Sequence, residues 1–251
     1  MKRVFDPHEP ELMDRPQPVS AELRRDLENL VSLNRYFGSH RLIRRFLSAW
    51  LRPGRVYRIL DLCTGFGDIP RVMVEWGRRR EISLRIDAID ANDSTLALAR
   101  GSTPCAPEIR YERADVLTFE ASERYDLVCC SLALHHFSED DAVRLLQRCR
   151  ELSHRFVLVT DLERSHVTAL GVWALTQFIY RDPMTRHDGR ASAERAFSFS
   201  EMRALAEAAE WEDFGHARFA FCRQAIWLDR REVTGVHELA AAVAEPLPNP
   251  A

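Results

Sequence analysis

The first fifth of the chain alternates apolar and polar residues with the period of an α-helix. Apolar side chains recur three or four positions apart along residues 20–51, which predicts helical structure that packs through one face. The pattern is interrupted at Tyr36–Gly38, so we expect a second helix over residues 41–51. Pro53 and Gly54 then form a strong break. Residues 1–18, rich in proline and acidic side chains, predict an irregular arm before the first helix.

The period changes after this break. Short apolar runs predict buried strands, and the longer segments between them predict helices. The strands are expected over residues 57–62, 84–89, 109–113, 125–131 and 156–160, and the helices over residues 67–80, 94–100 and 139–152. Strands that alternate with helices are typical of βαβ units and a parallel sheet. Ligands of such sheets bind at the carboxyl ends of the strands.

The alternation stops after the fifth strand. Residues 163–197 contain an apolar helix, Val167–Tyr180, and then a turn-like segment, RDPMTRHDGRAS. A further helix is expected over residues 200–209, followed by two strands at about 212–221 and 223–229. The connection between these strands is too short for a crossover helix, so we expect them to pair antiparallel.

Composition restricts the class of protein. The chain has 251 residues, of which 46% are hydrophobic and 29% charged, as in an ordinary globular protein. The formal net charge is −3, so no bulk positive field favours binding to nucleic acid or to an anionic membrane. Lys2 is the only lysine and the other 34 basic residues are arginine, which we attribute to codon bias.

The six cysteines show neither a C-x-x-C pair nor a zinc-like spacing to histidine, so we predict no metal site. Cys129 and Cys130 lie in an apolar run and are expected to be buried. We therefore expect the thiols to be reduced, as they are in a cytoplasmic protein. The first residues contain no apolar signal core, and the longest uncharged apolar run, Val167–Tyr180, is too short for a stable membrane insertion.

The segment ILDLCTGFGDIP, residues 59–70, carries the most specific signal. A buried strand ends in Asp61 and runs into Gly65 and Gly67 at the start of a helix, where free N–H groups can meet a ligand. A dinucleotide fingerprint would begin in the same way, but Pro70 stands where its third glycine belongs. The carboxylate of Asp61 would repel a pyrophosphate and suits an ammonium or sulfonium group. This contrast favours S-adenosylmethionine over NAD.

Acidic residues also follow the next two strands. Asp90 ends the second strand and could accept both ribose hydroxyls of an adenosine, with Ala91 beside it in the same site. Asp115 follows the third strand and could accept from an adenine amino group while the N–H of Val116 meets a ring nitrogen. Aspartate is also a common turn residue, so Asp115 alone is a weak signal.

The fourth strand leads into SLALHHF, residues 131–137. Ser131 leaves the strand at the edge of the expected site. His135 and His136 could contact the adenosine, orient a substrate or act as a base, since histidine titrates near neutral pH. The competing interpretation is that the two histidines only pack at the start of a helix.

In this order the four motifs resemble those of class I S-adenosylmethionine-dependent methyltransferases. DLCTGFGD is similar to the glycine motif of the ubiquinone and menaquinone biosynthesis methylases, and LALHHF resembles the small-molecule "type 11" methyltransferases. The resemblance covers residues 55–162 well and the rest weakly. It implies an α/β fold with a Rossmann-like, seven-stranded, mostly parallel sheet whose last strand is antiparallel. Helices are expected on both faces, with an N-terminal helical lid.

The resemblance also implies the cofactor contacts. It places Asp61, Gly65 and Gly67 around the methionine part, Asp90 on the ribose, and Asp115 and Val116 on the adenine. Cys63 stands where many members have the first glycine, and a small side chain there predicts crowding rather than loss of binding. The quinone C-methylating members have an Asn-centred motif after the fourth strand, where this chain has Ser131 and Leu132. We therefore do not carry over a quinone substrate.

The acceptor pocket of such a protein lies beside the cofactor, between the N-terminal helices and the segment after the fifth strand. Asp161, at the end of that strand, should face this pocket. The apolar segment Val167–Tyr180, with Trp173 and Phe178, would form a wall for an aromatic or lipid-like acceptor. Plain core packing and a subunit contact, which would make a homodimer, are the competing interpretations.

Two polar segments complete the candidate site. Arg186–Gly189 combines a cation, a histidine and a carboxylate, and His187 could deprotonate a phenol unless this is only a solvated turn. The segment resembles one in bacterial methyltransferases of polyketide or aromatic natural products, which favours O-methylation. Asn34–Gly38 could close over the cofactor, with Arg35 on the methionine carboxylate, or be an exposed turn between helices.

These features predict an arm and lid over residues 1–54, an S-adenosylmethionine-binding domain over 55–231 with a substrate-side insertion at 163–197, and a tail over 232–251. The expected activity is methyl transfer to a hydroxyl of an apolar aromatic or polyketide-like small molecule, with S-adenosylhomocysteine as product. The alternatives are C-methylation of a quinone or lipid precursor, cofactor binding without catalysis, and an NAD-dependent enzyme. The catalytic candidates are His135, His136 and His187, and the substrate-side candidates are Asp161, Trp173, Phe178 and Arg186.

Overall fold

The computed structural model describes residues 1–103 and 105–231, so the expected tail over 232–251 lies outside the described residues. The strands are β1 (Val56–Leu62), β2 (Ser83–Asp90), β3 (Ile109–Arg113), β4 (Tyr125–Ser131), β5 (Ser153–Leu162), β6 (Gly215–Phe219) and β7 (Arg223–Asp229). The helices are α1 (Ala21–Tyr36), α2 (Ser39–Trp50), α3 (Asp68–Arg79), α4 (Asp93–Gly101), α5 (Glu139–Leu152), α6 (His166–Phe178), α7 (Pro183–Arg195) and α8 (Phe199–Ala208). Two short 3₁₀ turns, η1 (Leu12–Asp14) and η2 (Leu134–His136), complete the elements.

The strands form one seven-stranded sheet in the order β3-β2-β1-β4-β5-β7-β6. Neighbouring strands are parallel in the part of the sheet from β3 through β2, β1 and β4 to β5. In contrast, β7 runs antiparallel to both β5 and β6. The chain order reverses between β1 and β4, the type of position where open parallel sheets bind ligands. The predicted α/β fold, with a mostly parallel sheet and an antiparallel last strand, is confirmed.

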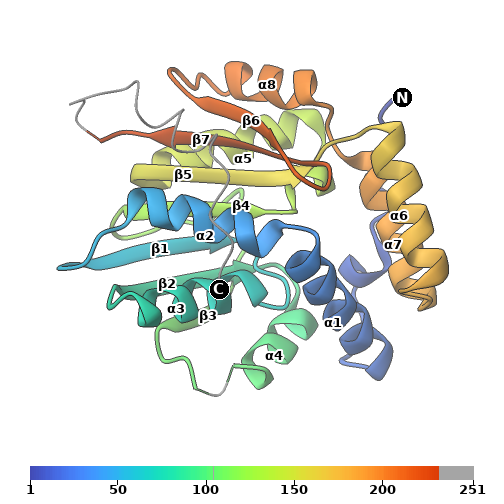
Figure 1. The fold of residues 1–251 in the computed structure, drawn as a ribbon, viewed down its shortest axis with the longest axis horizontal. Helices are drawn as coiled ribbons and strands as arrows, with labels where there is room; N and C mark the ends of the chain where they lie inside the picture. Colours follow the sequence, from blue (N-terminus) through green and yellow to red (C-terminus); the bar gives the residue numbers. More distant parts are fainter. Residues whose placement is uncertain (104, 232–251) are drawn as a thin grey trace.

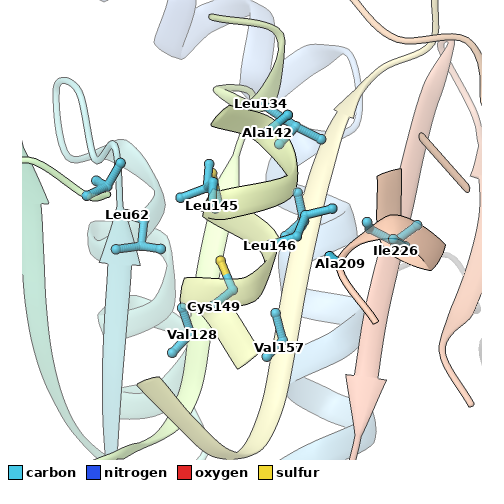
Figure 2. Close-up of a cluster of buried hydrophobic side chains, with 14 of the residues drawn as sticks. Leu62, Val128, Leu134, Ala142, Leu145, Leu146, Cys149, Val157, Ala209 and Ile226 are labelled. Atoms are coloured by element: carbon cyan, nitrogen blue, oxygen red, sulfur yellow. The ribbon is translucent and has the colours of Figure 1, made fainter. Parts of the chain in front are cut away.

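Helices cover both faces of this sheet (Figure 1). On one face α2 and α3 bury Phe46, Trp50 and Met73 against Tyr57 and Ile59 of β1. On the other face α5 and α8 pack against the alternate strand residues, and Figure 2 shows Leu145, Leu146 and Cys149 of α5 within this cluster. Cys129 and Cys130 are fully buried, as predicted.

A third group of elements gathers beyond the carboxyl ends of the strands (Figure 1). Leu23 and Leu27 of α1 pack with Phe66 of the glycine loop and Leu98 of α4. Helices α6 and α7 pack against each other, and α7 also contacts α1 and η1. Thus α1 and the first residues of the chain lie beside the ligand end of the sheet, whereas α2 belongs to the layer that covers one face. Within the described part of the chain, no helix combines the length and apolar character needed to cross a membrane.

The expected turn at RDPMTRHDGRAS is wrong, because most of this segment belongs to α7. The carboxylate of Asp182 accepts hydrogen bonds from the N–H groups of Met184 (3.0 Å) and Thr185 (3.4 Å), and Pro183 occupies the first turn, where no N–H is needed. Gly189 serves close helix packing instead of a turn, since a Cβ there would lie 3.2 Å from Val172 Cγ1 of α6. Capping and packing together outweigh the weak helix propensity of the segment.

Candidate functional site

A cavity of about 1190 Å³ opens at the carboxyl ends of the strands. Its wall comes from the loops after β1, β2, β3 and β4, from α1 and α6, and from the N-terminal arm. Seven of the expected cofactor residues line this cavity: Cys63, Gly65, Asp90, Ala91, Asp115, Val116 and Ser131. The structure therefore brings together, on the wall of one cavity, the motifs that follow four separate strands.

Asp90 connects two of these loops. Its Oδ2 accepts a hydrogen bond from the N–H of Gly65 (2.8 Å), and its Oδ1 accepts one from the N–H of Asn92 (2.9 Å). Burial raises the pKa of this carboxyl, which the two backbone hydrogen bonds oppose. Gly65 has a positive φ of 53°, and no atom lies within 4 Å of the place where its Cβ would be, so the loop leaves open space for a ligand.

Two expected cofactor residues, Asp61 and Gly67, do not line the cavity. The Asp61 side chain is buried, and its Oδ2 has no hydrogen-bond partner among the described residues. Burial raises the pKa of Asp61 to about 7, and the carboxylates of Asp68 and Asp90 add to the shift. Gly67 begins α3 in the left-handed region with φ 71°, and a Cβ there would overlap the ring of Tyr111.

Arg35 is exposed, does not line the cavity and lies over the ring of Tyr36. Its neighbour Asn34, also in α1, does line the cavity. Asn34 Nδ2 donates to Asp68 Oδ2 (3.1 Å), which also lies 2.7 Å from His40 Nε2. Burial opposes ionisation of Asp68, but these two partners outweigh it and lower the pKa of the carboxyl. The sequence did not reveal this link between α1, α2 and α3.

His135 is buried on the cavity wall and is oriented by Asp161. The carboxylate of Asp161 accepts from the backbone N–H of His135 (2.9 Å) and lies 2.7 Å from its Nδ1. The opposite ring nitrogen, Nε2, is buried without a hydrogen-bond partner among the described residues. Asp161 itself does not line the cavity, so its contact with the site runs through His135.

His136 also lines the cavity and pairs with the arm. Its Nδ1 lies 2.7 Å from Asp14 Oδ2. Burial lowers the pKa of His136, but the carboxylates of Asp14, Glu11 and Asp161 outweigh burial and raise the pKa to about 10. Glu11 Oε1 accepts from Ser192 Oγ (2.9 Å) and lies 3.7 Å from His135 Nε2. Burial raises the pKa of Glu11. The arm thus brings one buried carboxyl, Glu11, and one partly exposed carboxyl, Asp14, to the two histidines.

The arm is held in place by α7 and η2. The carboxylate of Asp188 accepts from the N–H groups of Leu12 (2.7 Å) and Met13 (2.9 Å). Arg3 donates to the carbonyl of Phe137 (2.7 Å). His187 lies 2.8 Å from Asp188 but is half exposed, and neither His187 nor Arg186 lines the cavity. The structure thus gives Asp188 of the RHDG segment a clear task, which is to fix the arm.

Apolar side chains form the remaining walls. Leu27, Leu30 and Val31 line the cavity from α1, and Val172 and Leu175 line it from α6. The two aromatic residues expected in this wall point elsewhere: Trp173 is 44% exposed and Phe178 is 65% exposed, and neither lines the cavity. Helix α6 is therefore a pocket wall through its smaller residues and carries its large aromatic residues on the outside.

Glu11 and Asp14 are the site residues that sequence reasoning missed. They lie in a proline-rich arm without helical or strand periodicity, more than 100 positions before the histidines they approach. The only signal in the sequence is the presence of acidic residues in that arm, which does not identify their partners.

The sheet order and the glycine loop followed by acids at successive strand ends define the class I methyltransferase fold. Residues 59–154 match the family model described as a methyltransferase domain. The resemblance to class I S-adenosylmethionine-dependent methyltransferases is thereby confirmed for the part of the chain that carries the cofactor motifs. No curated protein matches the chain in sequence.

Solved structures with this fold include three methyltransferases with bound cofactor or product. The plantazolicin methyltransferase BpumL, in complex with S-adenosylhomocysteine, has a TM-score of 0.62 and 14% identity, over 84% of this chain and 96% of that one. The plantazolicin methyltransferase BamL has a TM-score of 0.58 and 16% identity, over 80% and 79%. Human N-acetylserotonin methyltransferase, in complex with S-adenosylmethionine, has a TM-score of 0.59 and 16% identity, over 83% and 56%. At these identities the likeness shows the fold.

Proposed function

We propose that this protein transfers a methyl group from S-adenosylmethionine to a hydroxyl of an apolar aromatic or polyketide-like small molecule. The observation that carries the proposal is the position of the Glu11–His135–His136 cluster. It shares the wall of one cavity with residues of the glycine loop and with the apolar residues of α1 and α6. Titratable groups, the cofactor motifs and an apolar wall therefore meet in one cavity.

The glycine loop and the acidic residues near it fit S-adenosylmethionine. The unpartnered Oδ2 of Asp61 provides a carboxylate oxygen near the glycine loop, and the Asp90 carboxylate faces the cavity beside it. These acids suit a ligand that carries an ammonium group and ribose hydroxyls, and the open Gly65 allows close approach. When bound, S-adenosylmethionine supplies an electrophilic methyl group on a sulfonium.

The residues of the chain have three tasks in this reaction. The cavity aligns the acceptor oxygen with the methyl group, and its apolar walls exclude water. The histidine cluster is where the acceptor hydroxyl loses its proton, which a neutral phenol must do to become a strong nucleophile. Asp161 holds the ring of His135 for this task.

The acceptor class rests on the cavity rather than on relatives. The structural neighbours are described by different acceptors, a plantazolicin in two cases and N-acetylserotonin in the third. In this chain the apolar part of the cavity wall is formed by leucine, valine and phenylalanine side chains, including Phe37 and Phe221. An apolar ring can pack against such a wall while a single hydroxyl reaches the Glu11–His135–His136 cluster.

The test is methyl transfer to a panel of phenols that carry alkyl or aryl substituents, with the products identified by mass spectrometry and NMR. We expect methyl ethers from the wild-type protein and at least 10-fold lower turnover from His135→Gln. Methyl groups on carbon would instead support the C-methyltransferase alternative. Calorimetry that shows tight binding of S-adenosylhomocysteine but no turnover would support a non-catalytic protein, and preferential binding of NAD would overturn the cofactor assignment.

A further inference from the structure

Three side chains that can ligate a metal ion meet on the cavity wall. One carboxylate oxygen of Glu11 and one ring nitrogen from each of His135 and His136 lie within 4.8 Å of one another. Glu11 is 2% exposed and His135 is 2% exposed, so this is a buried group and not a patch of surface acids. Two histidines and one carboxylate are a ligand set typical of catalytic zinc and of other divalent transition metals.

The ring of His135 is prepared for a ligand on its open side. Its Nδ1 is 2.7 Å from the Asp161 carboxylate, which can only accept a hydrogen bond, so Nε2 is the ring nitrogen left for a further ligand. That Nε2 is buried without a hydrogen-bond partner among the described residues. Its distance of 3.7 Å to Glu11 Oε1 is too long for a hydrogen bond. Two tetrahedral ligands of one zinc ion lie about 3.4 Å apart, so small side-chain shifts are enough for both to bind.

His136 is supported in the same manner. Its Nδ1 lies 2.7 Å from Asp14 Oδ2, so each histidine of the cluster has a carboxylate on one ring nitrogen. Histidines that bind metal almost always donate their second ring nitrogen to such a partner, which fixes the ring and strengthens the ligand. If His135, oriented by Asp161, acted only as a general base, neither the second carboxylate–histidine pair nor the buried Glu11 would be needed.

We propose that Glu11, His135 and His136 bind a divalent transition-metal ion, with zinc as the best match to this nitrogen and oxygen ligand set. Three protein ligands leave one position open toward the cavity, as in catalytic zinc sites. The spacing of cysteines and histidines could not predict this site, because one ligand comes from the arm and the other two from η2. The binding of the ion is independent of the proposed function, whereas its chemical role rests on it.

That role is to acidify the acceptor. The hydroxyl oxygen occupies the open position, and the ion lowers the pKa of the hydroxyl so that the proton leaves to water near neutral pH. The resulting oxyanion attacks the methyl carbon in line with the sulfur. The new O–C bond forms as the C–S bond breaks, and the bonding electron pair passes to sulfur, which leaves as the neutral thioether of S-adenosylhomocysteine.

The test measures metal binding to the full chain without any acceptor. Cobalt(II) and zinc are titrated into metal-stripped protein, and zinc content is determined after dialysis. We expect one equivalent of either ion, visible cobalt absorption without a sulfur-to-cobalt band, and at least 10-fold weaker binding in Glu11→Gln and His135→Gln. His154→Ala, which removes a half-exposed histidine at the start of β5, is the matched control and should bind as the wild type does. Calorimetry with S-adenosylhomocysteine establishes that each variant is folded.

Several results would overturn the site. These are sub-stoichiometric binding in the wild type, equal affinity in folded Glu11→Gln and His154→Ala, or a sulfur-to-cobalt band, which would point to Cys63 or Cys222 on the cavity wall. Failure of the proposed function would look different, since the protein would bind zinc but methylate none of the phenols. Full turnover after metal stripping would refute the role of the ion and leave His135 as the direct proton acceptor.

Discussion

Asp161 accepts two hydrogen bonds from His135, one from the backbone N–H (2.9 Å) and one from Nδ1 (2.7 Å). A single carboxylate at the end of β5 thus fixes both the position and the ring orientation of a residue in η2. Burial opposes ionisation of Asp161, but the contact with His135 outweighs it and lowers the pKa of the carboxyl. Because Asp161 does not line the cavity, it acts as a positioning residue.

Replacing Asp161 by asparagine should reduce turnover far more than cofactor binding. The amide keeps the shape of the side chain but carries no charge, so the His135 ring loses its anionic partner. We expect kcat to fall about 10- to 100-fold, the range typical of a residue that orients a ligating or catalytic histidine. The KM for S-adenosylmethionine should change little, and initial-rate kinetics separate the two constants. An unchanged kcat would mean that the ring orientation of His135 has no part in the reaction.

Asp90 should govern the affinity for the cofactor. Its carboxylate accepts from Gly65 and Asn92 and faces the cavity, so Asp90→Ala removes both a loop contact and a charged acceptor for ribose hydroxyls. We expect binding of S-adenosylhomocysteine to weaken by about 1.5–3 kcal/mol in calorimetry. Asp87→Ala is the control, because Asp87 lies on the same strand but accepts from the hydroxyl of Tyr125. Equal affinity in the Asp90 variant and the wild type would contradict the ribose assignment.

Gly65 and Gly67 should respond differently to the same substitution. Both have positive φ, so alanine is strained at either position. Gly65→Ala meets no atom within 4 Å and should cost only the strain, about 1–2 kcal/mol of stability. Gly67→Ala also places a methyl group on the ring of Tyr111, so we expect a clearly lower melting temperature than in Gly65→Ala and loss of cofactor binding. Equal melting temperatures for the two variants would argue against this packing.

The sequence predicted the regular part of the fold closely. β3, β4 and α5 have the expected bounds, because each is an apolar or amphipathic run with clear turn signals at both ends. It failed at α7, where the Asp182 cap and close packing on α6 override residues of weak helix propensity. Propensity is a weak prior that tertiary contacts can reverse.

The candidate site was predictable only in parts. Asp161, His135 and His136 were each expected at the site, but their partners were not. Glu11 and Asp14 reach the histidines because Asp188 fixes the arm, and such contacts between distant segments leave no period or spacing in the sequence. The expected contacts of Trp173 and Phe178 rested on residue type, which does not say which face of α6 turns inward.

The pH dependence of stability should contain a contribution from Asp26. Burial raises the pKa of this carboxyl to about 7; a hydrogen bond from Thr185 opposes the shift, and the carboxylates of Asp188, Asp182 and Glu11 add to it. In the unfolded chain the pKa is about 4, so the folded state holds a proton that the unfolded state releases. The contribution of Asp26 to the free energy of unfolding is therefore fully present below about pH 4 and is lost as the pH rises to about 7.

Asp26→Asn removes this titration, because the amide is neutral at every pH. Relative to the wild type, the variant should gain on the order of 1–4 kcal/mol in the free energy of unfolding between pH 5 and pH 8. Urea unfolding at the two pH values gives the difference. Asp61, whose pKa is also about 7, is present in both proteins, so its contribution cancels. Parallel pH profiles for the two proteins would show that Asp26 is ionised in the folded state.

Releasing the N-terminal arm should reduce turnover while the cofactor-binding residues stay in place. Asp188 is buried and accepts from the N–H groups of Leu12 and Met13, so Asp188→Ala removes both anchors that keep Glu11 and Asp14 beside the histidines. We expect at least a 10-fold lower kcat and faster cleavage after Glu11 by a glutamate-specific endopeptidase, because a detached arm opens locally far more often. Affinity for S-adenosylhomocysteine should change less than 3-fold.

Two further variants separate loss of the arm from general damage to α7. Arg190→Ala removes an exposed side chain from the same helix and should leave both turnover and cleavage at wild-type levels. Asp188→Asn retains one acceptor oxygen and should fall between the wild type and Asp188→Ala, since a single amide oxygen replaces two charged acceptors. Because the arm delivers the carboxyls of Glu11 and Asp14 to the two histidines, cleavage rate and kcat should change together across the series. A variant with rapid cleavage after Glu11 but wild-type turnover would show that the reaction proceeds without the arm.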